Sequence, residues 1–267
     1  MPYATASDGT RLYFEEWSTT GDPLLLISGQ GSDHTGWYAL RNDFAKKYHV
    51  IVYDHRGTGR SDKPTAPPYS TRGFAQDAIS ILDHLNIPRA HAYGISMGGR
   101  ICQWLGIDHA ERIGSLVLGC TTPGNVHGVA RSPEINAHMA QPSTDPVEGV
   151  RFSLSMLYSP AWIAAHPEIE AYLLQTPQLP EYVRQLHYRA SEGHDSWDLL
   201  PAIQAPTLVI HGSEDELNPT ANAPLLAERI PHAELYLVKG GRHGYFIEFR
   251  EEASRVVSDF LARHPLA

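Results

Sequence analysis

Hydrophobic and polar positions change their period along this chain in a regular order. Residues 3–7 and 11–17, joined by the Asp8-Gly9 turn, predict a β-hairpin. Residues 24–27 form a continuous apolar run, which is typical of a strand buried on both faces of a sheet. Further strands are predicted at residues 50–53, 90–95, 113–118, 207–211 and 233–238. The pattern therefore predicts an eight-stranded sheet.

Apolar residues at helical spacing fall between these strands. A helix capped by Ser70 or Thr71 is predicted after the strand at 50–53, and another begins after residue 95 and continues through Leu105. A closing helix has one apolar face, made of Ala253, Val256, Val257, Phe260 and Leu261. Regular alternation of strands and helices predicts an α/β fold, with a mostly parallel sheet covered by helices on both faces.

The alternation stops near residue 122 and resumes at residue 207. Residues 123–205 are rich in proline and aromatic side chains and contain helix-like stretches. We therefore predict one core, made of residues 1–122 and 206–267, with a helical cap inserted at residues 123–205. Beyond the insertion, Asn218-Pro219 predicts the start of a helix, yet Pro224 would either kink that helix or delay its start.

The sequence Gly94-Ile95-Ser96-Met97-Gly98 lies between a predicted strand and a predicted helix. A G-x-S-x-G sequence at this place is typical of a nucleophile elbow, a tight turn that holds its serine in a strained backbone conformation. The helix that follows would direct its N-terminal N–H groups at the site, which favours a developing negative charge. We predict Ser96 as a nucleophile; the alternative is a glycine-rich turn with an incidental serine.

A serine hydroxyl is a poor nucleophile until a base takes its proton. His243 is predicted as this base, because it lies in a glycine-rich loop after the last strand, and ligand sites of parallel sheets lie at the carboxyl ends of strands. His211 is the alternative base. A carboxylate must then fix the tautomer of the base, and Glu214, Asp215 and Glu216 all follow the strand at 207–211. Composition does not choose among these three.

Composition excludes several kinds of partner. A formal net charge of −9 argues against binding to nucleic acid or to an anionic membrane. The 15 histidines form no HExxH or His–Cys cluster at ligand spacing, so we expect no metal. Cys102 and Cys120 do not form a CxxC pair, and neither a signal peptide nor an apolar run long enough to span a bilayer is present. We expect a cytoplasmic enzyme without a cofactor, and the sequence leaves its oligomeric state open.

Several stretches resemble α/β-hydrolases, and the resemblance covers the whole chain. They are Ser28-Gly29-Gln30-Gly31, Asp54-His55-Arg56-Gly57-Thr58-Gly59-Arg60-Ser61, Gly94-Ile95-Ser96-Met97-Gly98-Gly99, His211-Gly212-Ser213-Glu214-Asp215 and Gly241-Arg242-His243-Gly244. The resemblance implies that the His-Gly-x-x-Asp spacing marks Asp215 as the acid of a Ser96, Asp215, His243 triad. It also implies an oxyanion hole made of the backbone N–H groups of Met97 and Gln30, although Ser28 stands where the family usually has histidine. The run from 54 to 61 resembles a structural turn of the family.

Shorter segments resemble two groups within that family. Residues 96–99, 103–106, 159–162 and 166–168 are similar to 3-oxoadipate enol-lactonases. The Gly-x-Gly loop before Trp37 is more similar to small bacterial esterases and cofactor-free haloperoxidase-type members. Haloalkane dehalogenases and epoxide hydrolases of this fold have aspartate at the elbow, so Ser96 excludes them. The resemblance implies hydrolysis of a small apolar ester through an acyl-enzyme. The alternatives are an enol-lactone or other lactone hydrolase, a perhydrolase or a C–C bond hydrolase with the same triad, and a ligand receptor without catalysis.

The predicted cap carries many aromatic and apolar side chains, and we expect a few of them to line an apolar pocket over Ser96. Tyr158 and Trp162 are predicted to contact the small-molecule substrate, because their segment matches the enol-lactonase-like stretch. An enol-lactone with a free carboxylate would need a nearby cation, for which the candidates are Arg131, Arg151, Arg184 and Arg189. Because the triad residues all follow strands, we expect the sheet, and not the cap, to hold them.

Overall fold

The computed structural model describes residues 2–66, 69–176 and 178–266, and it contains one eight-stranded sheet. The strands are β1 (Tyr3–Thr5), β2 (Arg11–Glu16), β3 (Pro23–Ile27), β4 (His49–Tyr53), β5 (Ala90–Ile95), β6 (Ile113–Gly119), β7 (Thr207–Gly212) and β8 (Ala233–Val238). Their order across the sheet is β1-β2-β4-β3-β5-β6-β7-β8. The pairs β1–β2 and β2–β4 are antiparallel, and every pair from β4 to β8 is parallel. The predicted mostly parallel sheet is confirmed.

Two apolar layers cover the two faces of this sheet. Alternate residues of β3 point to opposite sides, so Leu25 and Ile27 belong to one core cluster and Leu24 and Leu26 to the other. The first face is covered by α2 (Thr71–His84), α3 (Met97–Asp108) and α9 (Asn222–Arg229). The second face is covered by α1 (Arg41–Phe44), α10 (Tyr245–Glu248) and α11 (Arg250–Ala262). Helices therefore cover both faces, as the sequence predicts.

Local sequence features explain where α2 and α9 begin. Ser70 caps α2, and its hydroxyl accepts a hydrogen bond from the Gly73 N–H. The conflict at Pro224 is resolved by a delayed start, because α9 begins at Asn222 and Pro224 stands in its first turn, where a missing N–H is tolerated. Between β3 and β4 the chain also forms the 3-10 helix η1 (His34–Leu40), which the hydrophobic pattern did not predict.

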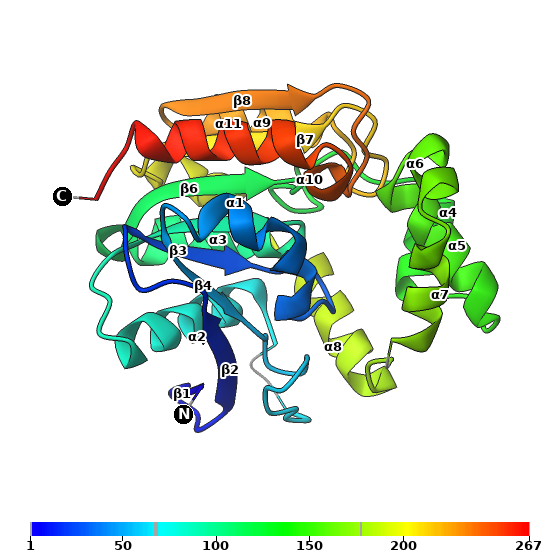
Figure 1. Cartoon of the computed structure of the whole chain (residues 1–267), viewed down its shortest axis with the longest axis horizontal. Coiled ribbons are helices and arrows are strands. Elements are labelled where there is room, and N and C mark those ends of the chain that lie inside the picture. The colour runs from blue at the N-terminus through cyan, green and yellow to red at the C-terminus, as the bar shows by residue number, and fades with distance from the viewer. Residues whose placement is uncertain (1, 67–68, 177, 267) are drawn as a thin grey trace.

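The segment between β6 and β7 carries a group of helices of its own. They are α4 (Pro133–Ala140), α5 (Pro146–Leu157), α6 (Pro160–Ala165), α7 (Glu168–Gln175), α8 (Glu181–Glu192) and the 3-10 helix η3 (Trp197–Ala202). In Figure 1 the arrowheads of β6 and β8 point toward α4 to α7, so these helices lie beyond the carboxyl ends of the parallel strands. The division into a core and a cap at residues 122 and 206 stays a prediction. None of the helices in the described parts of the chain combines the length and the apolar composition that crossing a bilayer requires.

Candidate active site

Ser96 occupies a strained turn between β5 and α3. Its φ is 56° and its ψ is −118°, a conformation that residues with a Cβ rarely adopt. The turn is tight enough that a Cβ on Gly98 would lie 2.1 Å from the carbonyl oxygen of Ile27, and one on Gly94 would lie 2.1 Å from the carbonyl oxygen of Gly98. Only glycine fits at both places. The G-x-S-x-G sequence thus lets the first turn of α3 pack directly against the end of β3.

The neighbouring strand β6 supports this turn. The Ser96 N–H donates to the Gly119 carbonyl at 2.8 Å, and the Thr121 hydroxyl donates to the Ser96 carbonyl at 2.8 Å. Both bonds use the backbone of Ser96, so its hydroxyl is not needed to hold the turn. The side chain of Ser96 lies against Gly29 of the loop after β3, because a Cβ on Gly29 would be 3.3 Å from the Ser96 Cβ.

His243 and Asp215 come together at the carboxyl ends of β7 and β8. The His243 Nδ1–H donates to Asp215 Oδ2 at 2.8 Å, which leaves Nε2 of the ring to accept a proton. Both side chains are buried, whereas Glu214 and Glu216 are exposed. The structure therefore pairs His243 with Asp215 among the three carboxylates that composition left open, and the catalytic roles of these residues stay predictions.

Asp215 is held by partners that the sequence did not indicate. Its Oδ1 accepts the Asn218 N–H at 2.9 Å, and its Oδ2 lies 3.1 Å from Nε2 of His211, the alternative base. Burial alone would raise the pKa of Asp215, but the charge of His243 and the hydrogen bonds from His211 and His243 together lower that pKa well below its ordinary value. Asp215 therefore remains ionised beside His243. Asn218, expected at a helix start, instead holds the carboxylate of Asp215.

The loop after β3 forms a turn beside Ser96. The Ser32 N–H donates to the Gly29 carbonyl at 3.3 Å, and Gly31 has a φ of 72°, as the third residue of a type II turn requires. Gln30 is the second residue of this turn, and its N–H is not used by the bond that closes it. Met97 is the first residue of α3, where a helix leaves its N–H without an intrahelical partner. This arrangement fits the oxyanion-hole roles predicted for Gln30 and Met97.

The insertion also contacts the segment that carries His243. We call residues 155–162, from the last turn of α5 into α6, the cap corner, and residues 242–244 the base loop. The bonds between them run from the Arg242 guanidinium to the Ser155 carbonyl, from the His243 N–H to the Met156 carbonyl (3.4 Å) and from the Gly244 N–H to the Leu157 carbonyl (2.8 Å). These carbonyls end α5 and would otherwise lack partners. The expectation that the sheet alone holds the triad therefore needs correction for His243.

Glu248 of α10 extends this contact. Its carboxylate accepts both the N–H (2.9 Å) and the hydroxyl of Ser159, the residue that caps α6. Tyr158 is almost fully buried and packs on Gly244, and its ring stacks on that of Trp162 with centroids 4.1 Å apart. The two aromatic residues predicted to contact substrate thus lie at the cap corner, next to the base loop.

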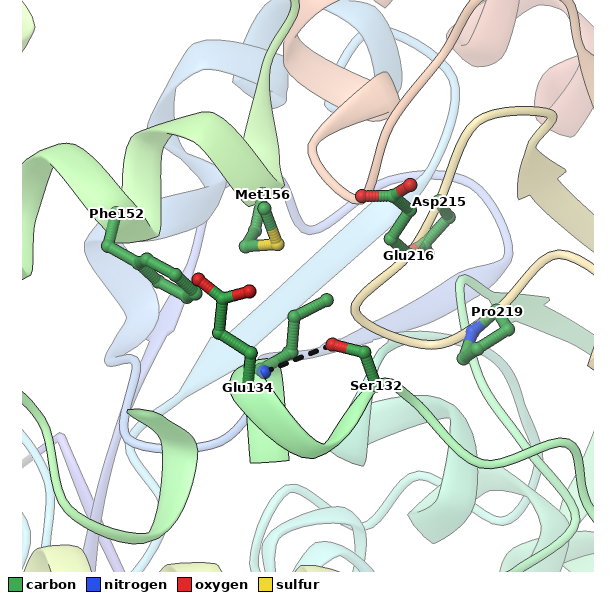
Figure 2. Close-up of a pocket in the computed structure, with 8 residues that line it drawn as sticks. Ser132, Glu134, Phe152, Met156, Asp215, Glu216 and Pro219 are labelled. Atoms are coloured by element: carbon green, nitrogen blue, oxygen red, sulfur yellow. Dashed lines mark hydrogen bonds between the residues drawn. The ribbon is translucent and has the colours of Figure 1, made fainter. Parts of the chain in front are cut away.

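A pocket of about 410 Å³ lies between the insertion and the loop after β7. Figure 2 shows its walls, with Phe152 and Met156 from α5 facing Ser132 and Glu134 at the start of α4, and Glu216 and Pro219 beside Asp215. Its charged residues are the carboxylates Glu134, Asp215 and Glu216. Tyr158 and Trp162 are not among the described residues that line it.

The arginines proposed to bind a substrate carboxylate are mostly engaged elsewhere. Arg131 pairs with Glu192, Arg151 with Glu170 (3.0 Å) and Arg184 with Glu181 (2.6 Å). Arg189 is exposed on α8. The candidate cations of the insertion therefore have carboxylate partners already or face solvent.

One group of side chains in the described ranges has its ligand atoms close enough together for a metal: Asp33, His34 and Asp54, within 4.8 Å of one another. The protein satisfies these groups itself, since His34 Nδ1–H donates to Asp54 at 2.6 Å and the Arg60 N–H donates to the other Asp54 oxygen at 2.7 Å. Burial would raise the pKa of Asp54, but these hydrogen bonds lower it. This arrangement fits the structural turn predicted for residues 54–61.

Comparison with known proteins gives consistent matches. Residues 22–249 match the alpha/beta hydrolase fold family. The "Putative carbamate hydrolase RutD" of Pseudomonas syringae pv. syringae is 33% identical over 248 residues, which cover 91% of this chain and 94% of that protein. The solved structure of Est816, described as an N-acyl homoserine lactone degrading enzyme, is 31% identical with a TM-score of 0.84, covering 97% of this chain and 100% of that one. A thermophilic esterase from Thermogutta terrifontis is 25% identical with a TM-score of 0.84, covering 99% and 98% of the two chains.

Proposed function

This chain belongs to the α/β-hydrolase family, and from that premise we propose that it is a serine hydrolase that cleaves a small, uncharged carboxylic ester through an acyl-enzyme. The observation that carries the proposal is the strained turn at Ser96, whose φ of 56° projects the side chain from the elbow, together with the buried His243–Asp215 pair. Strain at a non-glycine residue persists only where the surrounding structure maintains it, and here β6 and the loop after β3 do so.

In the first step, the Ser96 Oγ attacks the ester carbonyl while His243 Nε2 takes the hydroxyl proton. The carbonyl oxygen becomes an oxyanion, which the Met97 and Gln30 N–H groups stabilise, and losing one such donor costs about 2.7–4 kcal/mol in serine hydrolases. Ionised Asp215 stabilises the imidazolium and holds its Nδ1–H. When the C–O bond breaks, His243 returns the proton to the departing alcohol, and the acyl group stays on Ser96.

In the second step, water replaces the alcohol. His243 Nε2 takes a proton from the water as its oxygen attacks the acyl carbonyl, and the same N–H groups stabilise the second oxyanion. The bond between Ser96 Oγ and the acyl carbon then breaks, His243 returns the proton to Oγ, and the free acid leaves. These two reaction steps need no change of oxidation state and no chemical group beyond these side chains, the backbone N–H groups and water.

The charges around the site favour an uncharged substrate. The pocket beside Asp215 contains carboxylates, and the cap arginines are paired or exposed. Asp215 lines this pocket, whereas Ser96 and His243 are not among its described lining residues, and we infer that part of a substrate bound at Ser96 extends toward it. A free carboxylate that entered the pocket would meet like charges, and the repulsion is several times larger near a protein surface than in bulk water. These features support a neutral ester over an enol-lactone that carries a carboxylate.

A neutral lactone is the second candidate substrate. The relative at 31% identity over nearly the whole chain is described as degrading N-acyl homoserine lactones, which carry no carboxylate before ring opening. Opening a lactone uses the same serine, base and oxyanion donors, with the alcohol remaining attached to the acyl group. Carbamate cleavage, for which several relatives are named, would use the same groups on a less reactive carbonyl.

The purified protein is expected to hydrolyse p-nitrophenyl acetate and butyrate, and to act at least about tenfold less well on p-nitrophenyl hydrogen succinate than on its methyl ester. Values of kcat/KM for these esters, a five-membered lactone and a phenyl carbamate give the test. Equal rates on the two succinates would contradict the charge argument. A lactone or carbamate preferred over every ester would replace the ester in the proposal, and no turnover of any of them would refute it.

Trp162→Ala and Tyr158→Ala test whether the cap corner selects substrates. If Trp162 lines the acyl site, kcat/KM for acetate, butyrate and octanoate esters should change unequally, since a methylene gained or lost in a pocket is worth roughly 1–3 kcal/mol. Tyr158, which packs on Gly244, should instead lower all three values by a similar factor, because its removal loosens the base loop. If Trp162→Ala lowered kcat/KM for all three esters by a similar factor, Trp162 would support the base loop, as proposed for Tyr158, and would not line the acyl site.

A further inference from the structure

Asp215 Oδ2 lies between two imidazole rings. His243 donates to it from Nδ1 at 2.8 Å, and His211 approaches it with Nε2 at 3.1 Å. His211 belongs to β7 and is completely buried, whereas His243 lies on the base loop. One histidine that meets the acid is therefore fixed by the sheet, and the other is held by loop contacts.

The surroundings of His211 determine where its proton lies. Its Nε2 is 2.8 Å from the Asn218 carbonyl oxygen as well as 3.1 Å from Asp215 Oδ2, and both of these atoms are acceptors. Its Nδ1 is buried and has no hydrogen-bond partner among the described residues. A proton on Nδ1 would be an unsatisfied buried donor, so the ring carries its proton on Nε2 and shares it between the two oxygens.

A carboxylate turns about its Cβ–Cγ bond unless both oxygens are held. The Asn218 N–H holds Asp215 Oδ1 at 2.9 Å, and His211 is the donor fixed by the sheet on Oδ2. Without His211, Oδ2 would keep only the bond from His243, whose own position depends on the base loop. The Asp215 carboxylate would then turn with the His243 ring. In a triad the carboxylate should instead fix the orientation of that ring.

Resting on the serine-hydrolase function proposed above, we propose that His211 is a positioning residue of the triad: its Nε2–H fixes Asp215 Oδ2 in line with His243 Nδ1. His211 touches no reacting atom in this scheme and acts only through Asp215. The His-Gly-x-x-Asp spacing has a physical reason in this arrangement, because it places the histidine at the end of the strand and the aspartate across the turn from it.

The test compares three variants of His211 with a matched control. Glutamine places an amide N–H about as far from the backbone as imidazole Nε2, whereas asparagine reaches only about as far as Nδ1, and leucine has no donor. His91→Leu is the control, because His91 is also completely buried on a strand and its Nε2 likewise faces a carboxylate, that of Asp22, but at 3.8 Å and without a hydrogen bond. It lies at the opposite end of β5 from Ser96.

For p-nitrophenyl butyrate, His211→Leu and His211→Asn should lower kcat about 10- to 100-fold, the factor that a hydrogen bond to a charged group is worth, with KM changed less than about twofold. His211→Gln should stay within about threefold of the wild-type kcat, and His91→Leu should match the wild type. The His243 Nδ1 proton should remain visible at low field in the proton NMR spectrum of the glutamine variant and be lost or broadened in the other two.

Wild-type kcat in folded His211→Leu or His211→Asn would overturn the proposal, as would glutamine and asparagine variants that are equally impaired. If the leucine variant does not fold, the glutamine and asparagine pair decides alone. The NMR signal does not depend on turnover, so it tests His211 even if the wild type hydrolyses no ester. In that case the proposed function fails, while the positioning of the acid is still confirmed or refuted.

Discussion

Ser96→Ala is expected to abolish ester hydrolysis and leave the fold intact. Without the hydroxyl no acyl-enzyme can form, and in a related triad enzyme removing the serine costs about 10⁶ in kcat. The turn should survive, because the bonds to Gly119 and Thr121 use the backbone of residue 96, and alanine keeps that backbone. The measurement is kcat for p-nitrophenyl butyrate together with the thermal unfolding midpoint.

Ser115→Ala is the matched control for this change. Ser115 is completely buried on β6, and its hydroxyl has no hydrogen-bond partner among the described residues. Ser115→Ala removes a serine hydroxyl oxygen, as Ser96→Ala does, but it leaves the elbow unchanged. This variant should therefore keep the wild-type kcat. More than a few per cent of wild-type activity in folded Ser96→Ala would show that another residue is the nucleophile.

Asp215→Asn is expected to lower kcat by up to about 10⁴, by analogy with the trypsin-type triad, in which the amide leaves the base in the wrong tautomer. The local geometry adds a reason. The oxygens of Asp215 accept hydrogen bonds from Asn218, His243 and His211, so the NH₂ of an asparagine would face at least one of these donors. The measurement is kcat on the same ester.

Glu214→Gln and Glu216→Gln are the controls for the acid. Both side chains are exposed, and each lies next to Asp215 in sequence, so a general effect of charge near the loop would appear in them as well. We expect both variants to keep kcat within about threefold of the wild type. A glutamine variant more damaged than Asp215→Asn would mean that the His-Gly-x-x-Asp spacing does not mark the acid.

The strands and the elbow could be predicted from the sequence because local chemistry determines them. Buried parallel strands are continuous apolar runs, and the G-x-S-x-G sequence is itself a local pattern, in which Gly94 is required by its contact with Gly98. The requirement for glycine at position 98 comes from β3, because a Cβ there would meet the Ile27 carbonyl oxygen. The identity of the proposed acid could not be predicted from local chemistry in the same way. Composition left Glu214, Asp215 and Glu216 equal, and only the family resemblance selected Asp215, because what distinguishes it is its position across the turn from His211.

Two features could not be predicted, one because it depends on a contact between distant parts of the chain and the other because a local sequence pattern has two possible structural uses. The bond between Ser159 and Glu248 joins residues 89 positions apart, and neither residue has a distinctive local pattern. Asn218 was expected to start a helix since Asn-Pro commonly does so. The structure uses its N–H on Asp215 instead, and α9 begins at Asn222.

The contacts between the cap corner and the base loop restrict how this enzyme's substrate range can be redesigned. Grafting the whole insertion from a relative would replace residues 155–159 while leaving Glu248 and the base loop in place. A chimera of that kind would change the support of His243, the proposed general base, along with the pocket. Exchanges confined to α4, which lines the pocket with Glu134 and Ile135, leave these bonds in place, so we expect that helix to accept substitutions that change specificity without disturbing the support of His243.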